Sequence, residues 1–153
     1  MPGGTIPYTP KGLAFDFQWG SIRLAMNSAF VAVVYSDKAC VSCSASKRQA
    51  YASWAASQLH YALGSTGRSF VVGYGVNPPV RPHHRGASCV IGVACSIGFS
   101  SPNPHVIEGA LVGGPGSDDS YADVRTDYVK NEVALDYNAA FSGVVARFVA
   151  AAA

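Results

Sequence analysis

The chain has 153 residues, which is room for one ordinary domain. Only 13% of them are charged, 49% are apolar and the formal net charge is +2, so the composition argues against a disordered tail and against a nucleic-acid-binding surface. The opening residues, MPGGTIPYTPKG, have Pro and Gly where a secretory signal would have a basic and then an apolar region, so we expect no signal peptide and no membrane span in this chain.

Helical spacing first appears between Phe17 and Tyr35. Large side chains recur there at helical steps and predict one face, formed by Trp19, Ile22, Arg23, Met26, Asn27, Phe30 and Val34. The dipeptide Ser36-Asp37 should end this helix. We expect Trp19 to lie in the core of a helix–helix seam with Arg23 extended along it, in preference to contacting a ligand.

A second helix is predicted from Lys47 to Leu63, with Gly64 as its C-terminal stop. Its apolar stripe consists of Tyr51, Trp54, Ala55, Gln58, Leu59 and Ala62. We interpret this stripe as packing, and we assign no role to His60 on the same helix.

The cysteines form two local pairs, Cys40 with Cys43 and Cys89 with Cys95. The second pair is spaced more widely than the ligands of a zinc site usually are, so we expect no metal. A disulfide between Cys89 and Cys95 is one alternative, with Cys40 and Cys43 as free thiols in a loop. Spacing alone does not decide the connectivity.

Residues 64–116 lack helical periodicity and are rich in Gly, Pro, Ser and Asn. An irregular stretch of this length in a compact domain is usually functional, because sites concentrate in loops that a rigid scaffold presents. Part of it, residues 69–85, reads SFVVGYGVNPPVRPHHR. This part ends in a group of basic side chains, Arg81, His83, His84 and Arg85.

Residues 121–139, YADVRTDYVKNEVALDYNA, interleave acids with tyrosines. From Asn131 onward apolar side chains recur at helical steps, namely Val133, Tyr137, Phe141, Val144 or Val145, and Phe148. We therefore expect Glu132 near a helix N-terminus, and Asp123 and Asp127 on the irregular segment before it. Rings beside carboxylates suit a sugar, whose C–H faces stack on rings and whose glycosidic oxygen needs a proton donor. The alternative is an amphipathic helix behind a solvated acidic loop.

Two gapped patterns in these segments resemble the signatures of glycoside hydrolase family 9, the cellulase family. The downstream pattern consists of Tyr121, Asp123, Tyr128, Glu132 and Asn138. The upstream pattern consists of Ser69, Val71, Val72, Gly75, Asn77, Pro82, His83 and Arg85. Residues 9–30 and 103–114 also look like segments of such enzymes, whereas residues 89–101 are less polar than the family's usual loop.

The resemblance implies an all-α fold, namely the C-terminal portion of an (α/α)6 barrel with helices joined by long loops. Residues 1–153 would form a single incomplete catalytic domain, roughly the last quarter of such a barrel. Its apolar helix faces should then lack partners, and function should require the N-terminal part of the barrel. Because the family is mostly secreted, the missing signal suggests that the chain starts within a longer protein.

The resemblance also implies inverting hydrolysis of internal β-1,4-glucosidic bonds in cellulose or related β-glucans. We expect no cofactor. Calcium occurs in some members of the family, but this sequence has no dense loop of oxygen ligands that predicts a metal site. Glu132 matches the family's general acid. Asp123 matches its active-site aspartate, a support and sugar-contact position. His83 and Arg85 match substrate-binding positions, and Tyr137 matches a tyrosine that lines the cleft.

A general base is missing from the pattern. In the family the water-activating aspartates lie in an Asp-Ala-Gly-Asp motif, which does not occur here; the only adjacent aspartates are Asp118 and Asp119. We therefore expect an endo-1,4-β-glucanase by family whose isolated chain is inactive. The alternatives are a non-catalytic remnant that at most binds β-glucan and an unrelated helical interaction module.

Overall fold

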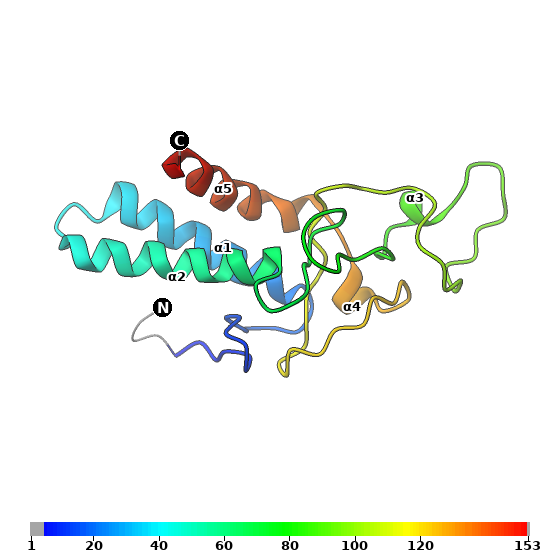
Figure 1. The fold of residues 1–153 in the computed structure, drawn as a ribbon, viewed down its shortest axis with the longest axis horizontal. Helices are drawn as coiled ribbons and strands as arrows, with labels where there is room; N and C mark the ends of the chain where they lie inside the picture. Colours follow the sequence, from blue (N-terminus) through cyan, green and yellow to red (C-terminus); the bar gives the residue numbers. More distant parts are fainter. Residues whose placement is uncertain (1–4, 153) are drawn as a thin grey trace.

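The computed structural model describes residues 5–152. Its helices are α1 (Ser21–Val34), the π-helix η1 (Tyr35–Ala39), α2 (Ala45–Leu63), α3 (Arg85–Ser88), α4 (Tyr128–Asn131) and α5 (Leu135–Ala152). Elsewhere in the described residues backbone pairing is limited to isolated bridges, so the predicted all-α class is confirmed. Figure 1 shows α1, α2 and α5 side by side at one end, and α3, α4 and the long loops at the other. No helix within residues 5–152 is both long and apolar enough to cross a membrane.

The buried face of α1 consists mainly of small residues. α1 packs against both α2 and α5. Its buried residues are Ser21, Ile22, Ala25, Met26, Ala29, Ala32 and Val33. Phe30 and Val34, which were predicted on the packed face, are 40% and 43% exposed. Small side chains let helix axes approach closely, and Ile22 and Met26 are the large side chains that this face buries completely. At Gly143 of α5, for example, a Cβ would come within 2.5 Å of the Phe30 ring.

Trp19 lies outside α1, and the prediction that it packs in a helix seam is wrong. Gly20 precedes the helix in the left-handed conformation (φ 70°), so the chain turns before Ser21 and leaves Trp19 40% exposed. α1 itself ends at Val34, one residue before the predicted last residue Tyr35, but the chain continues directly as the π-helix η1 through Ser36 and Asp37. Ser36 is buried there and donates its hydroxyl to the carbonyl of Arg48 at 3.0 Å, which ties this turn to α2.

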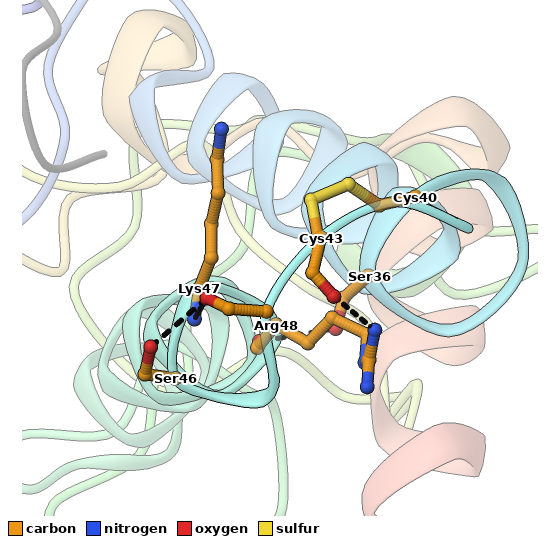
Figure 2. Close-up of a disulfide and its surroundings, with 7 residues drawn as sticks. Ser36, Cys40, Cys43, Ser46, Lys47 and Arg48 are labelled. Atoms are coloured by element: carbon orange, nitrogen blue, oxygen red, sulfur yellow. Dashed lines mark hydrogen bonds between the residues drawn. A yellow bond between two sulfur atoms is a disulfide. The ribbon is translucent and has the colours of Figure 1, made fainter.

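Both cysteine pairs form disulfides, Cys40 with Cys43 and Cys89 with Cys95. The expectation of free thiols at Cys40 and Cys43 is therefore wrong. Figure 2 shows their bridge in the turn between η1 and α2, where Arg48 donates a hydrogen bond to the Cys43 carbonyl. An ion pair between Arg147 and Asp37, 2.8 Å long, joins η1 to α5.

α2 carries the predicted stripe and begins at Ala45 rather than Lys47. It ends as predicted, at a glycine with φ 111°. The polar residue of the stripe, Gln58, is buried and joins residues 12–14 of the N-terminal segment to α2 by hydrogen bonds. Its Oε1 accepts from the Ala14 N–H at 2.8 Å, and its Nε2 donates to the Gly12 carbonyl at 3.0 Å.

Residues 113–115 connect the start of α1 to α4. The Ile22 N–H donates to the carbonyl of residue 113 at 3.0 Å, and Ser21 Oγ donates to the carbonyl of residue 115 at 2.8 Å. On the other side, the Gly114 N–H donates to the Lys130 carbonyl at 2.9 Å. This crossing brings the residues that precede α1 next to those that follow α4.

We predict that Gly114→Ala destabilises the fold more than Gly12→Ala does. Both glycines have positive φ, 109° and 97°, so alanine at either position costs about 1 to 2 kcal/mol. A Cβ at Gly114 also comes within 2.7 Å of Ser21 Oγ and 2.8 Å of Ile22 Cγ1, whereas nothing lies within 4 Å of one at Gly12. This overpacking should add about 1 to 3 kcal/mol. Urea unfolding measures both losses, and equal losses would contradict the close approach of residues 113–115 to α1.

Candidate active site

Glu132 lies in an extended segment between α4 and α5, with φ −60° and ψ 145°. We expected Glu132 near a helix N-terminus, and it lies three residues before α5, which begins at Leu135, but outside the helix itself. Neighbouring segments pair with this backbone on both sides, His83 with Glu132 and Val112 with Val133. Backbone groups that bond to neighbouring segments are not available for a first helical turn, so the helix starts after them.

One oxygen of the Glu132 carboxyl group is held by two donors. Oε2 accepts from Trp19 Nε1–H at 2.8 Å and from the Tyr137 hydroxyl at 2.9 Å. Oε1 has no hydrogen-bond partner among residues 5–152. Burial, and then the hydrogen bond to Glu132, raises the pKa of Tyr137, so its hydroxyl remains a donor at neutral pH. The two donors thus orient the carboxyl group and leave Oε1 free.

Arg23 supports the second of these donors. Its guanidinium carbon lies 5.0 Å from the centre of the Tyr137 ring, and its Nη1 lies 2.9 Å from Asp136 Oδ2. Trp19 and Arg23, which were predicted to share a helix seam, therefore both contribute to the surroundings of Glu132. Trp19 binds the carboxyl group, and Arg23 packs on Tyr137.

A row of aromatic rings lies beside Glu132. The ring centroids of Trp19 and Tyr128 are 5.1 Å apart, and those of Tyr128 and His83 are 6.1 Å apart. Trp19 and Tyr128 are 40% and 48% exposed. Half-exposed rings next to a carboxyl group offer apolar faces to a ligand that also needs a polar partner.

His83 and Arg85 face a common hollow of about 340 Å³, whose lining also includes Cys95, Ile97 and Arg125. His83 Nδ1 lies 2.7 Å from the Arg125 carbonyl, which can only accept, so Nδ1 carries a proton and Nε2 is left for another partner. The Arg85 side chain is exposed and makes no hydrogen bond or ion pair with residues 5–152. The structure therefore brings these two predicted residues together with their polar groups available.

Asp123 holds the turn that leads to His83. Its Oδ2 accepts from the Val80 N–H at 2.8 Å and its Oδ1 from the Arg81 N–H at 3.1 Å. The side chain is only 10% exposed, and both oxygens are occupied by protein donors. Asp127 caps α4 instead, as its side chain accepts from the backbone N–H of the third residue of that helix.

The adjacent aspartates are engaged elsewhere. Asp119 Oδ1 accepts from the Tyr61 hydroxyl at 2.5 Å and Oδ2 from the Lys11 N–H at 2.7 Å. Asp118 is exposed, and hydrogen bonds from Ser120 lower its pKa. Among residues 5–152, no three His, Cys, Asp or Glu side chains are grouped so that they could hold a metal ion.

Arg125 supports the hollow and was not identified from the sequence. It is 2% exposed, and its Nε donates to Asn103 Oδ1 at 2.5 Å. Its other nitrogens donate to the carbonyls of Phe99 at 2.5 Å and Ser101 at 2.8 Å. Since its own carbonyl accepts from His83, Arg125 fixes both the loop and the histidine. An arginine in an irregular stretch leaves no periodic signal that would have predicted this burial.

Asn131, directly before the acid, is the second residue that the sequence analysis missed. It is fully buried. Its Oδ1 accepts from the Tyr121 hydroxyl at 2.5 Å, and its Nδ2 donates to the carbonyls of Ala122 at 3.0 Å and Asp127 at 3.2 Å. Burial raises the pKa of Tyr121 and keeps it a donor. Its position next to Glu132 within the downstream pattern was the one available signal.

The family model described as Glycosyl hydrolase family 9 matches residues 1–145. The chain belongs to this family. Endoglucanase B of Cellulomonas fimi is 47% identical over 150 residues, which are 96% of this chain and 14% of the relative. Endoglucanase A of Bacillus pumilus is 47% identical over 148 residues, 94% of this chain and 21% of the relative. The chain thus spans 14% and 21% of the lengths of these two relatives.

Solved structures of endoglucanases share the fold. The crystal structure of CelQ from Clostridium thermocellum, complexed with cellotetraose, superimposes with a TM-score of 0.87 at 48% identity over 97% of this chain and 24% of CelQ. The endoglucanase of the termite Nasutitermes takasagoensis gives 0.85 at 45% identity over 98% of this chain and 34% of that enzyme. These similarities confirm the predicted family and the prediction of an all-α portion of its (α/α)6 barrel.

We predict that Asn131→Asp destabilises the protein by about 3 kcal/mol, because a carboxylate oxygen would replace the Nδ2 donor opposite two buried carbonyls. Asn27→Asp is the matched control: Asn27 is exposed on α1, and the change should cost less than about 0.5 kcal/mol.

Urea unfolding at neutral pH compares the two variants. The loss at position 131 should shrink below the ordinary aspartate pKa of about 4, where the introduced carboxyl group is neutral in both the folded and unfolded chains. A loss at position 131 as small as that at position 27 would mean that Asn131 does not tie α4 to the preceding loop.

Proposed function

We propose that this chain supplies the general acid and one wall of the cleft of an endo-1,4-β-glucanase that hydrolyses β-1,4-glucan with inversion. The observation that carries the proposal is the double contact on one oxygen of Glu132. Because Trp19 and Tyr137 both donate to Oε2, the proton of the neutral carboxyl group belongs on Oε1. Oε1 then passes this proton to the glycosidic oxygen as the bond to the leaving sugar breaks.

The surfaces next to Glu132 support a β-glucan as the substrate. The half-exposed rings of Trp19 and Tyr128 suit the C–H faces of glucose units. His83 Nε2 and the Arg85 guanidinium, which have no protein partner among residues 5–152, suit the hydroxyl groups. The structure of the relative CelQ, complexed with cellotetraose, supports the same ligand class for this chain.

In this proposal the water-activating carboxylate comes from outside these 153 residues. The sequence has no Asp-Ala-Gly-Asp motif, and both carboxylate oxygens of Asp119 and of Asp123 are bound by protein donors. Loss of a general base costs about 10²- to 10⁴-fold in rate. The isolated chain should therefore bind β-glucan without turnover and become active only with the remaining portion of a family 9 catalytic domain.

We also propose an extracellular location for the protein. Both cysteine pairs form disulfides, and structural disulfides persist in oxidising compartments outside the cytosol. A polymeric substrate such as cellulose is also accessible only outside the cell that degrades it.

A chimera tests the role of Glu132. Because this chain aligns with the termite endoglucanase over 98% of its length at 45% identity, it can replace the matching part of that enzyme. We expect the chimera to release reducing ends from a soluble β-1,4-glucan, and Glu132→Gln to lower kcat by about 10²- to 10⁴-fold. The only other glutamate provides the matched control, and Glu108→Gln should leave kcat within about twofold. A chimera whose activity survives Glu132→Gln would exclude Glu132 as the proton donor.

The same assay on the isolated 153-residue chain tests the missing base. We expect no reducing ends above those of its Glu132→Gln variant. Turnover that vanishes in this variant would show that the chain contains a water-activating group of its own.

Tryptophan signals test glucan binding directly. The chain has two tryptophans, whose indole N–H groups donate to different partners: Trp19 to Glu132 and Trp54 to the Tyr8 hydroxyl at 2.7 Å. We expect cellotetraose to shift the Trp19 indole resonance in NMR spectra and to leave that of Trp54 in place. Equal shifts, or none at millimolar cellotetraose, would contradict a glucan cleft beside Glu132.

A further inference from the structure

The loop that follows α3 exposes aliphatic side chains that no helix covers. Val90, Ile91, Val93 and Ile97 are 48%, 97%, 63% and 41% exposed. We call residues 89–97 the apolar loop; the disulfide between Cys89 and Cys95 closes most of it into a ring. In Figure 1 this part of the chain projects beyond α3, away from α1, α2 and α5. Its apolar surface therefore has no role in the helical core, and a cluster of this kind usually marks a contact with a ligand or partner.

The apolar loop borders the hollow that contains His83 and Arg85. Cys95 and Ile97 line that hollow on the side of the loop, and Arg125 contributes to its lining as well. One wall thus presents hydrogen-bond donors, and the other presents a disulfide and an aliphatic side chain. This combination matches a glucose unit, whose hydroxyl groups lie around the ring edge and whose C–H groups lie on its faces.

We propose that the apolar loop forms an additional binding contact for β-glucan, packing on the C–H face of a glucose unit held at or next to His83 and Arg85. This inference rests on the proposed function, since it assigns the same ligand to a surface that continues from the same hollow. The shared lining favours β-glucan over a second copy of this chain, because Cys95 and Ile97 of the loop face the same hollow as the exposed Arg85.

The two ends of the apolar loop are held differently. At and beyond Ile97, Arg125 donates to the carbonyls of Ile97 at 3.4 Å, Phe99 at 2.5 Å and Ser101 at 2.8 Å. On the N-terminal side of Ile97, residues 89–96 make only local backbone hydrogen bonds within the described part of the chain. These run from the Cys89 N–H to the Arg85 carbonyl and within the turn at 90–93. The disulfide is therefore the link that keeps the tip beside the hollow, and it limits the conformational freedom lost when a sugar binds.

Two changes in the apolar loop test the inference, each with a matched control in the other disulfide loop. Ile97→Ser removes the aliphatic contact, and Val41→Ser changes a side chain that is 91% exposed between Cys40 and Cys43. Replacing both Cys89 and Cys95 by Ser opens the apolar loop, and the same double replacement of Cys40 and Cys43 opens the other. All four changes lie in loops, but Cys40 is buried, at 7% exposure, so circular dichroism has to show that each variant folds before its affinity is compared.

Titration of the 153-residue chain with cellotetraose, followed by NMR, measures the affinity. We expect each change in the apolar loop to weaken binding by about 3- to 10-fold, as loss of one aliphatic contact would, and each control to stay within about twofold. His83→Ala reports on the hollow itself and should abolish most of the binding.

Binding that is lost in His83→Ala but unchanged by Ile97→Ser and by opening the apolar loop would overturn this inference and leave the proposed function standing. Absence of binding to the unmodified chain would overturn both. If Ile97→Ser instead converts a dimer to a monomer in sedimentation without changing the affinity for cellotetraose, the apolar loop binds a second copy of the chain and the inference is wrong.

Discussion

The site depends on one short stretch of backbone that is prevented from becoming helical. Residues 131–133 are paired with His83 on one side and with Val112 on the other, although the residues that follow form α5. This double pairing places Glu132 between two irregular segments and points its carboxyl group at donors from before α1 and from the first turn of α5. If α5 began earlier, the acid would lie on a helix surface and lose at least one of these contacts.

Buried polar side chains, rather than a sheet, hold the loops around this stretch. Gln58, Asn131 and Arg125 are each almost completely buried. Gln58 and Arg125 bind backbone groups of segments distant in sequence, and Asn131 binds carbonyls of the loop that precedes α4 and of the residue that caps this helix. Such groups stabilise a fold only when every donor and acceptor is satisfied, because an unpaired buried group costs more than the bond contributes. The loop-bearing end of the molecule is therefore specific in conformation even though it contains little regular structure.

Helical periodicity predicted α2 and the packed stripe of α5, where Tyr137, Phe141 and Val144 are buried. Large apolar side chains recur at helical steps on the packed faces of these two helices, so the helical period can be recognised in the sequence. Periodicity misplaced Trp19 and the start of α5, because a left-handed glycine and backbone pairing decide those points and neither affects the spacing of apolar residues. The family patterns located the segments that carry the site, but they contain neither Trp19 nor Arg125, whose roles arise only from contacts across the fold.

The bonds that complete the site join the two ends of the chain. The hydrogen bond from Trp19 to Glu132 and the ion pair of Arg23 with Asp136 each span 113 positions, and the contact of Lys11 with Asp119 spans 108. During synthesis Trp19 therefore leaves the ribosome long before Glu132 is made, and α1 and α2 can pack together while Glu132 is still to be synthesised. Since closing such long loops is slow compared with forming local helices, we expect the acid and its donors to assemble late in folding.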